Sequence, residues 1–476
     1  MDADVIVVGA GPVGLFLAAE LELAGAEPLV LERLLAPSKE TKARGLGALA
    51  TEALRRRGLG DQLAEADVEG TKDLARDHGS TRGHFANIFK IVPDPERPRT
   101  NIWQPELERV LAKHAAGVRV LRGHEVVAVE SDVDGVTVTA GQREWRAKYV
   151  VGCDGGRSAV RKLAGFGFPG TPALLRTTAG RVRFAGAVPP SGRYATGTFM
   201  HGGSMTGVSE LVTGPEPEGP EGPVTPAELA EVIQRVTGTE VVVSEIHDAR
   251  RFGDQARQAA TYRLGRVFLA GDAAHVHSPS GGQGLNLGLL DAANLGWKLG
   301  AVIRGDKPEA FLDTYTRERH PAGEAVLRNT RAQSALLAPG PHVDALREIL
   351  GEVLDLPEAN RYFADLLSGV RERYDFPYPA PAPVGEHCPD LELIGDGRVS
   401  RLHEHTRTGR GLLLRTPETR HLADPRVDVV PVTNTGPLLL RPDGVIAWAG
   451  EGPLDVALGA WFQSGSTTSP PPRKAS

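Results

Sequence analysis

The sequence predicts an α/β protein made of a Rossmann-like domain, an inserted and mainly antiparallel β-sheet domain, and a separate C-terminal domain. Three observations support this prediction: a glycine fingerprint at the N-terminus, a second strand–glycine–helix junction near residues 265–288, and a Pro-rich linker at 377–384. With 476 residues, 41% of them hydrophobic and 24% charged, the chain has room for about three globular domains.

The N-terminal motif is a dinucleotide-binding fingerprint. Residues 4–8 form a continuous apolar run typical of a buried parallel strand, and Gly9, Gly11 and Gly14 follow it before a helix expected over 15–24. In this pattern the first glycine makes the turn, the second lets a pyrophosphate approach the backbone, and the third packs helix against strand.

An acid at the right distance completes the fingerprint. A second apolar strand over 28–33 carries Glu32, eighteen residues after Gly14, where an acid binds ribose hydroxyls. A glycine-rich turn without a ligand does not require this order of strand, helix, strand and acid. Arg44 lies in a glycine-bounded turn before a helix through Arg57, and it is either a surface cation or a contact to phosphate or ring.

Residues 70–151 are expected to form a mixture of strands, loops and one helix. Residues 70–102 are short strands or loops of another layer, and a helix follows over 104–116. Short strands with hairpin spacing are expected over 118–130, 136–140 and 145–151.

A further apolar strand, over 145–151, is followed by an acid at Asp154. The apolar run Val150–Val151 is followed by Asp154, Gly155 and Ser158, and a helix carries Val160. Asp154 and Ser158 are either ligand-binding residues or ordinary helix caps, and the motif alone does not separate these roles. Cys153 is expected to be a small buried residue.

Residues 172–262 are rich in Gly and Pro and show the alternation of apolar and polar residues that is typical of antiparallel strands. We expect a compact sheet domain of roughly 90 residues between Thr171 and Arg263. Its elements are expected as strands 178–184, 205–212 and 241–246, a surface loop 214–223, and a helix 226–236.

The stretch 265–288 combines a buried strand over 267–270, Asp272 at its end, a glycine-rich turn, and a helical pattern from Leu289 onward. Such a junction offers an acceptor for sugar hydroxyls, backbone N–H groups that no side chain blocks, and the positive end of a helix dipole. A reduced flavin with its ribityl chain fits this description. His275 and His277 bracket the turn, and we expect His275 to pack in the core rather than act as an acid or base.

The remainder predicts helices and a last domain. Helices are expected over 313–332, 343–354 and 358–369, and strands over 411–414, 427–432, 438–440 and 445–449, the last after a turn at 441–444. The Ser/Thr/Pro-rich tail 464–476 is expected to be disordered.

Composition excludes several classes of protein. A net charge of -6 gives no basic footprint for nucleic acid or anionic membranes. The two cysteines, Cys153 and Cys388, form neither a CxxC pair nor a metal set, and no apolar run reaches the roughly 18 residues of a membrane span. The acidic, glycine-broken N-terminus is not a signal peptide, so we expect a cytoplasmic protein without a metal.

The chain carries three motifs in a fixed order: the GxGxxG motif with Glu32, the DGxxSxVR motif at 154–161, and the Gly271-Asp272 motif with its 279–286 turn. In this order they resemble the motifs of the FAD-dependent class A aromatic hydroxylases of the p-hydroxybenzoate hydroxylase fold. The resemblance is strongest to the branch of polyketide-antibiotic hydroxylases and rifampicin monooxygenase. It implies a C-terminal domain of thioredoxin-like fold, which here lacks CxxC and is therefore expected to be structural.

The resemblance implies a set of cofactor-binding residues. Asp154 and Arg161 would also serve NAD(P)H, and the backbone of Gly284–Asn286 would approach the flavin edge. The implied FAD-binding residues are Gly9, Gly11, Val13, Gly14, Glu32, Arg33, Arg44, Gln104, Asp154, Asp272, Pro279, Gly282, Gly284, Leu285 and Asn286.

The motifs, the changes in composition along the chain and the resemblance together predict the domain limits. The FAD-binding domain comprises 1–70, 103–171 and 263–376, and the substrate-binding sheet domain 71–102 and 172–262. A linker at 377–384 leads to the thioredoxin-like domain at 385–463.

The implied reaction is a monooxygenation. NADPH or NADH, docking transiently because no second GxGxxG is present, reduces FAD; molecular oxygen then gives a C4a-hydroperoxyflavin that hydroxylates a polycyclic aromatic polyketide. Antibiotic inactivation of a rifamycin-like substrate, Baeyer–Villiger oxygenation, an oxygen-independent flavin reductase and a non-enzymatic binding protein remain alternatives. A catalytic residue is not identified, and the protein is expected to be a monomer or homodimer. Residues that activate the phenol should come from the sheet domain, with candidates Arg181, Arg183, Tyr194 and His201.

Overall fold

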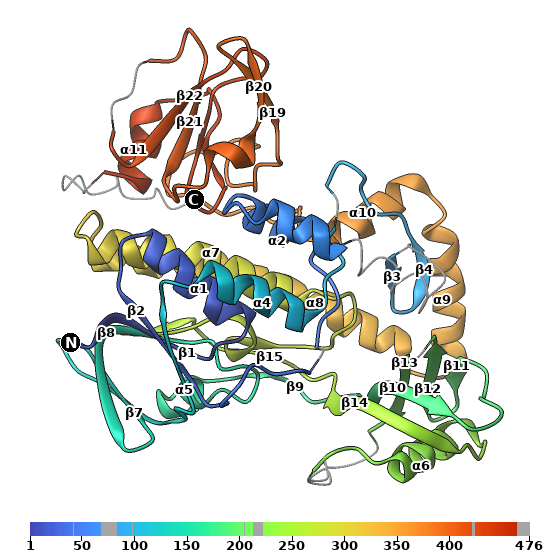
Figure 1. Ribbon diagram of the computed structural model, residues 1–476. Coiled ribbons are helices and arrows are strands. Elements are labelled where there is room, and N and C mark those ends of the chain that lie inside the picture. The colour runs from blue at the N-terminus through green and yellow to red at the C-terminus, as the bar shows by residue number, and fades with distance from the viewer. Residues whose placement is uncertain are drawn as a thin grey trace, which may run out of the picture.

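A computed structural model describes residues 1–40, 42–67, 83–97, 99–203, 205–212, 222–420 and 424–463. The expected disordered tail 464–476, most of the expected loop 214–223 and the stretch 71–82 lie outside the described residues. Figure 1 shows three parts: a sheet with helices packed on it, a smaller sheet domain beside α8 and α9, and a C-terminal domain above α2 and α7.

The first part is built on an eight-stranded sheet with a parallel centre. Its main order is β16-β17-β8-β1-β2-β5, and β7 extends it from β8 with β6 beyond. Strands β17, β8, β1, β2 and β5 are mutually parallel, while β16, β7 and β6 pair antiparallel. Their bounds are β1 Ala3–Val8, β2 Pro28–Glu32, β5 Arg119–Arg122, β6 Val126–Ser131, β7 Val136–Ala140, β8 Arg143–Gly152, β16 Arg263–Leu264 and β17 Val267–Leu269.

The expectation of a single strand with hairpin spacing over 118–130 was wrong. The segment divides at 123–125 into β5, which pairs parallel with β2, and β6, which forms the hairpin with β7. Gly123 adopts a positive φ of 73°, a conformation that glycine tolerates and that ends β5. The expected strands 136–140 and 145–151 are confirmed as β7 and β8, and they form an antiparallel pair.

Helices α1 and α7 lie together on the sheet and pack unusually closely (Figure 1). The contact uses glycines of α7: a Cβ at Gly296 would lie 2.5 Å from the Cβ of Glu20, and one at Gly300 would lie 2.4 Å from the Cβ of Ala24. Only glycine permits this approach, which explains glycines inside a helix that they intrinsically weaken. The helices of this part are α1 Pro12–Leu23, α2 Ala48–Arg55, α4 Gln104–His114, α5 Ala159–Leu163, α7 Gly284–Ile303 and α8 Asp313–Leu337.

The sheet domain is an antiparallel five-stranded sheet in the order β11-β12-β13-β10-β14. Helix α6 covers one face, where Phe199, Val208 and Ile233 form a separate apolar core. The expected helix 226–236 and both strands 178–184 and 205–212 are confirmed, while the last strand runs further, to Gly253. The elements are β10 Leu175–Phe184, β11 Gly192–Tyr194, β12 Gly197–Gly202, β13 Met205–Leu211, α6 Pro226–Thr237 and β14 Val243–Gly253.

Smaller elements join the two parts. Strands β3 and β4 form a hairpin whose apolar side packs on α8, α9 and α10 through Phe85, Leu336 and Phe363. A three-stranded sheet, β18-β15-β9, links the sheet domain to the turn after β17. The bounds are β3 Gly83–Phe85, β4 Ile88–Ile91, β9 Gly170–Thr171, β15 Ala256–Gln258, β18 His275–Val276, α9 Pro341–Val353 and α10 Pro357–Ser368.

The C-terminal domain contains a four-stranded sheet in the order β22-β21-β23-β24, with β21 parallel to β22 and antiparallel to β23. The strands expected from the sequence are confirmed, including the turn 441–444 between β23 and β24. The elements are β19 Glu392–Gly395, β20 Arg398–Arg401, β21 Gly411–Arg415, β22 Val427–Pro431, β23 Leu438–Leu440, β24 Ile446–Trp448 and α11 Leu454–Trp461.

The turn 441–444, which we call the RPDG turn after its residues Arg441, Pro442, Asp443 and Gly444, is one of the segments of this domain that contact the rest of the protein. Arg57, after α2, donates to the carbonyl of Pro442 at 2.9 Å and pairs with Glu20 of α1 at 2.6 Å. Beside this turn, Trp297 of α7 packs against Trp461. Both charged and apolar contacts therefore join the C-terminal domain to α1 and α7. Among the described residues, no helix is both long and apolar enough to span a membrane.

His387 makes the stability of this region depend on pH. The imidazole is 6% exposed, packs against Tyr374, and has no hydrogen-bond partner at either nitrogen among the described residues. Burial lowers the pKa of His387 to about 3, so the fold favours the neutral ring. An unfolded histidine titrates near pH 6.5, so stability is lost as the pH falls from about 6.5 towards 3, by up to about 1.4 kcal/mol per pH unit.

We therefore expect H387F to lose less stability than the wild type between pH 7 and pH 5. The measurement is the midpoint of thermal unfolding at the two pH values. H247F is the matched control because the His247 side chain is 65% exposed. An equal fall in midpoint for the wild type and H387F would contradict the prediction.

Candidate functional site

The predicted cofactor residues gather at one edge of the parallel sheet. Strands β1, β2, β8 and β17 all run in the same direction, so the segments that follow their last residues meet at the same edge. In an open α/β sheet this carboxyl edge is where ligands bind. Three of the motifs found in the sequence, at Gly9, Asp154 and Asp272, follow β1, β8 and β17 there.

The three glycines of the first motif differ in what surrounds them. Gly9 has a φ of 106°, and a Cβ there would lie 2.6 Å from the carbonyl oxygen of Cys153. A Cβ at Gly14 would lie 1.9 Å from the carbonyl oxygen of Gly9. At Gly11, by contrast, a Cβ would meet nothing within 4 Å, although its backbone is ordinary extended chain. Gly9 and Gly14 are needed for packing, and Gly11 faces the open space that a pyrophosphate requires.

Glu32 lies beside this turn at the end of β2. Its carboxylate accepts hydrogen bonds from the backbone N–H of Ala10 at 2.7 Å and of Leu34 at 2.8 Å. The acid thereby holds the glycine turn and stands at the strand end, where ribose hydroxyls are bound in this fold. Arg33, next in the chain, has an exposed side chain that points away from the core.

Asn286 connects the third motif to the loop that carries Arg44. Its Oδ1 accepts from the N–H of Gly47 at 2.6 Å, and its Nδ2 donates to the carbonyl of Gly282 at 2.7 Å. In the same loop Arg44 stacks over the ring of Trp103 at 4.4 Å. The backbone N–H of Gln104 donates to the carbonyl of Ala43 at 3.0 Å. The structure therefore brings Arg44, Gln104 and Asn286 together.

Helix α7 begins at Gly284, five residues before the helical pattern starts in the sequence. Packing explains why the helix includes Gly288, a residue with low helix propensity. A Cβ at this position would lie 2.7 Å from Val13 Cγ2, so only glycine fits there. Gly284, Leu285 and Asn286 therefore form the first turn of the helix, where backbone N–H groups have no intrahelical partner. These amides, with about half a unit of positive charge from the helix dipole, suit a ligand edge that gains negative charge.

Asp272 and the glycine turn stand open next to this helix start. The Asp272 side chain is exposed and forms no hydrogen bond or ion pair with the described residues. A Cβ at Gly284 would lie 3.9 Å from its Oδ1, so the acid reaches the helix start. Pro279 and Gly282 close the turn through a backbone hydrogen bond of 3.0 Å. A free carboxylate beside bare amides is the donor and acceptor set that a ribityl chain and flavin edge need.

Asp154 caps helix α5. Its carboxylate accepts from Ser158 Oγ at 2.6 Å and from the N–H groups of Ala159 and Val160 at 2.6 and 3.1 Å. Arg161 donates to the carbonyl of Ala273 at 2.9 Å, directly after Asp272. Both side chains thus have a structural role: they hold the second motif against the third.

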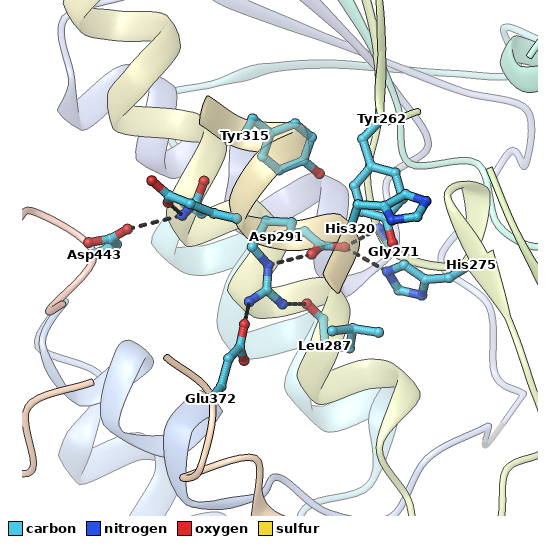
Figure 2. Close-up of polar contacts among 12 residues, drawn as sticks. Tyr262, Gly271, His275, Leu287, Asp291, Tyr315, His320, Glu372 and Asp443 are labelled. Atoms are coloured by element: carbon cyan, nitrogen blue, oxygen red, sulfur yellow. Dashed lines mark hydrogen bonds and ion pairs between the residues drawn. The ribbon is translucent and has the colours of Figure 1, made fainter. Parts of the chain in front are cut away.

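Sequence reasoning missed the residue that organises the third motif, Asp291 of α7. Its fully buried carboxylate accepts from the N–H of Gly271 at 3.0 Å, from His275 Nε2 at 2.8 Å and from Arg319 Nε at 2.8 Å. Figure 2 shows Asp291 between Gly271 and His275. Burial would raise the pKa of Asp291, but Arg319 and His275 outweigh it and lower the pKa. His275 is 0% exposed, which confirms its expected place in the core. The interior position of an Asp in an apolar helix was the available signal.

The open face of the sheet domain lies towards these elements. Side chains alternate along a strand, so the face opposite α6 carries Thr198, Met200 and Ser209. A cavity of about 230 Å³ lies there, lined also by Arg193 and Arg347.

Gln333 connects this region to the glycine turn. Its Oε1 accepts from the N–H of Ala86 at 3.0 Å, and its Nε2 donates to the carbonyl of Ser280 at 3.4 Å. Asn87, next to Ala86, lines the cavity. Gln333 of α8 therefore connects the β3–β4 hairpin, which contributes Asn87 to the cavity, with the glycine turn.

The four candidate substrate residues of the sheet domain do not line this cavity. Arg181 pairs with Asp248, and Arg183 pairs with Glu245 at 3.2 Å. The Tyr194 hydroxyl donates to the carbonyl of Pro190 at 2.6 Å, and His201 Nδ1 lies 2.9 Å from Thr206 Oγ1. Each has a partner within its own domain, whereas Arg193 and Arg347 line the cavity.

A Rossmann-type sheet, a glycine turn with open space at Gly11, and a second helix start beside an exposed acid are features of a flavin-binding oxidoreductase. The FAD binding domain family matches residues 2–330, and the family of the aromatic-ring hydroxylase C-terminal domain matches residues 382–464. The chain belongs to the FAD-dependent aromatic-ring hydroxylases.

Relatives extend over nearly the whole chain. A rifampicin monooxygenase of Streptomyces venezuelae is 39% identical over 96% of this chain and 98% of that protein. A 12-dehydrotetracycline 5-monooxygenase/anhydrotetracycline 6-monooxygenase of Streptomyces rimosus is 39% identical over 97% and 99%. The structure of an anhydrotetracycline hydroxylase from Streptomyces rimosus superposes with a TM-score of 0.86, at 38% identity, over 97% and 99% of the two chains. The protein is an FAD-dependent monooxygenase, and NAD(P)H is the usual reductant of its family.

Proposed function

We propose that this enzyme hydroxylates a polycyclic aromatic polyketide. The observation that carries the proposal is similarity, at 39% identity over almost the full length, to monooxygenases named for two different multi-ring antibiotics. The cavity on the face of the sheet domain opposite α6 supports it, since Thr198 and Met200 line this cavity and offer a hydroxyl and a flexible apolar side chain to a ligand.

The cofactor would lie along the carboxyl edge of the parallel sheet. Gly11 and Glu32 would hold its ADP half, Asp272 its ribityl chain, and the first turn of α7 the edge of its ring. Open space at Gly11 and the unpaired carboxylate of Asp272 support this placement. Bound FAD supplies electron transfer from the nicotinamide and activation of oxygen.

The chain's own contribution is to bind, orient and keep the site dry. The amides of Gly284, Leu285 and Asn286 would stabilise negative charge on the ring edge. The loop of Arg44, held by Asn286 through Gly47, would close over the same edge.

The proposal extends to the C-terminal domain and to location. The strand order β22-β21-β23-β24 with α11 following supports a thioredoxin-like fold. Its one cysteine, Cys388, is buried and free, so the domain would be structural and not a redox relay. Two free cysteines and no disulfide among the described residues support a cytoplasmic location.

The test is product analysis with labelled oxygen. The FAD-loaded enzyme is incubated with NADPH and ¹⁸O₂ and a panel of aromatic polyketides and rifamycins. We expect NADPH oxidation, oxygen uptake and a product that carries one ¹⁸O atom on an intact ring system. NADPH oxidation with a reduced substrate and no oxygen uptake would assign a reductase instead, and a ring-expanded product would assign Baeyer–Villiger oxygenation.

A second candidate function is inactivation of a rifamycin-like antibiotic. It is favoured by the rifampicin monooxygenase of Streptomyces venezuelae, which is as similar to this chain as the tetracycline enzyme. Both functions use the same site. Turnover of a rifamycin with loss of its antibacterial activity, and without turnover of other aromatic polyketides, would select this candidate.

A further inference from the structure

A continuous series of buried polar contacts runs from the C-terminal domain to the turn before Asp272. Its middle consists of two neighbours on α8, Glu318 and Arg319, which are 4% and 0% exposed. Glu318 contacts the RPDG turn, and Arg319 contacts Asp291. Because the two residues share a peptide bond, a shift of one moves the other.

At the C-terminal end, Arg441 forms two parallel hydrogen bonds with Glu318. Its Nη1 and Nη2 donate to Oε1 and Oε2 at 2.9 and 2.8 Å, and the guanidinium also pairs with Asp443. Lys298 adds a third donor to Glu318 at 2.8 Å. A forked pair of this kind fixes orientation as well as distance.

At the other end, Arg319 and Asp291 set the position of two backbone segments (Figure 2). Arg319 Nη2 donates to the carbonyl of Leu287 in α7 at 3.1 Å, and its Nε binds Asp291 Oδ1. Asp291 Oδ2 in turn accepts from the N–H of Gly271, the residue before Asp272. The contacts of Arg319 therefore fix the positions of both Asp272 and the first turn of α7.

We propose that this series, Arg441–Glu318 and Arg319–Asp291, is the route by which the C-terminal domain sets the geometry of the flavin site, with Asp291 and Arg441 as positioning residues. The inference rests on the proposed placement of FAD at Asp272 and α7. Buried ion pairs add little net stability compared with apolar packing, and their best-supported role is to specify one arrangement. A domain without redox cysteines thereby acquires a role in cofactor binding.

The test is a double-mutant cycle on the full-length protein, with the dissociation constant of FAD and the visible spectrum of bound FAD as readouts. We expect R441K and D291N each to weaken FAD binding by about tenfold, within the 5- to 150-fold range of typical coupling between sites. The double variant should lose less than the product of the two effects, because both changes interrupt one route. Bound FAD in R441K should also show a shifted spectrum.

R57K is the matched control. Arg57 is also buried and contacts the same RPDG turn through Pro442, but its ion-pair partner is Glu20 of α1. We expect R57K to lower the thermal midpoint of unfolding as R441K does and to change the dissociation constant of FAD less than about twofold. If R441K fails to fold, E318Q, which keeps the shape of Glu318 but removes its charge, breaks the same Arg441–Glu318 ion pair.

The outcomes separate this inference from the placement of FAD. D272A is included as a direct test of that placement. If D272A weakens FAD binding but R441K and E318Q leave both readouts unchanged, the coupling is overturned and the placement stands. If D272A and D291N both leave FAD binding unchanged, the placement itself is overturned. Independent, multiplicative effects of R441K and D291N would also overturn the coupling.

Discussion

The G11V protein should fold like the wild type and fail to retain FAD. A Cβ at Gly11 meets nothing within 4 Å, and the backbone there, at φ -76° and ψ -178°, is open to any residue. The two γ carbons of valine would occupy the space expected for the pyrophosphate, and overpacking of this kind costs about 1–3 kcal/mol. Near the upper end this corresponds to roughly 100-fold weaker binding. Titration of the flavin-free protein, followed by flavin fluorescence, measures the change.

G14A is the comparison variant for this prediction. Its Cβ would lie 1.9 Å from the carbonyl oxygen of Gly9, so the protein should lose thermal stability as well as FAD. The two neighbouring glycines are thus expected to separate a ligand effect from a folding effect. Wild-type affinity for FAD in G11V would show that the pyrophosphate does not lie against this turn.

R319M should be the most destabilising single change in the buried network. It leaves the carboxylates of Asp291 and Glu372 without the guanidinium that pairs with both, and Asp291 is 0% exposed. Removing one partner of a buried ion pair costs about 3–5 kcal/mol, because the other charge stays buried and uncompensated. The entropy of unfolding is about 2.1 cal/mol/K per residue, so for a chain of 476 residues we expect the midpoint of thermal unfolding to fall by roughly 3–5 °C.

R263M controls for the loss of an arginine that contacts the same helix. Arg263 pairs with Asp313 of α8 at 2.7 Å and with Glu309 at 2.8 Å, but these partners are 65% and 46% exposed. Exposed pairs contribute about 0–1 kcal/mol, so the midpoint should change by at most about 1 °C. Similar losses in R263M and R319M would mean that burial does not set the cost.

The parts of the site that the sequence predicted are those encoded by neighbouring residues. Gly9, Gly11 and Gly14 lie within one turn, and Glu32 lies at the end of the next strand, so the motif contains its own geometry. The helix caps at Asp154 and Ser158 are local in the same way. Local patterns also predicted most strands and helices, because alternation and helical periodicity act over a few residues.

What the sequence could not predict depends on residues far apart in the chain. Asp291 and Arg319 are separated by 28 positions, and Arg441 lies 123 positions beyond Glu318. No spacing rule connects such residues, since the fold alone brings them together. The start of α7 was misplaced for a related reason: glycine has low helix propensity, and only the contact of Gly288 with Val13 explains why it lies inside the helix.

The seam between α1 and α7 also sets an order of events during synthesis. Helix α1 is complete at Leu23, but the glycines that pack on it, Gly296 and Gly300, are translated more than 270 residues later. Until then the nascent chain exposes the apolar surface that α7 will cover, and contacts of such long sequence separation form slowly. Exposed apolar surface of this kind favours aggregation, and the packing of α1 against α7 is complete only after residue 303 has been synthesised.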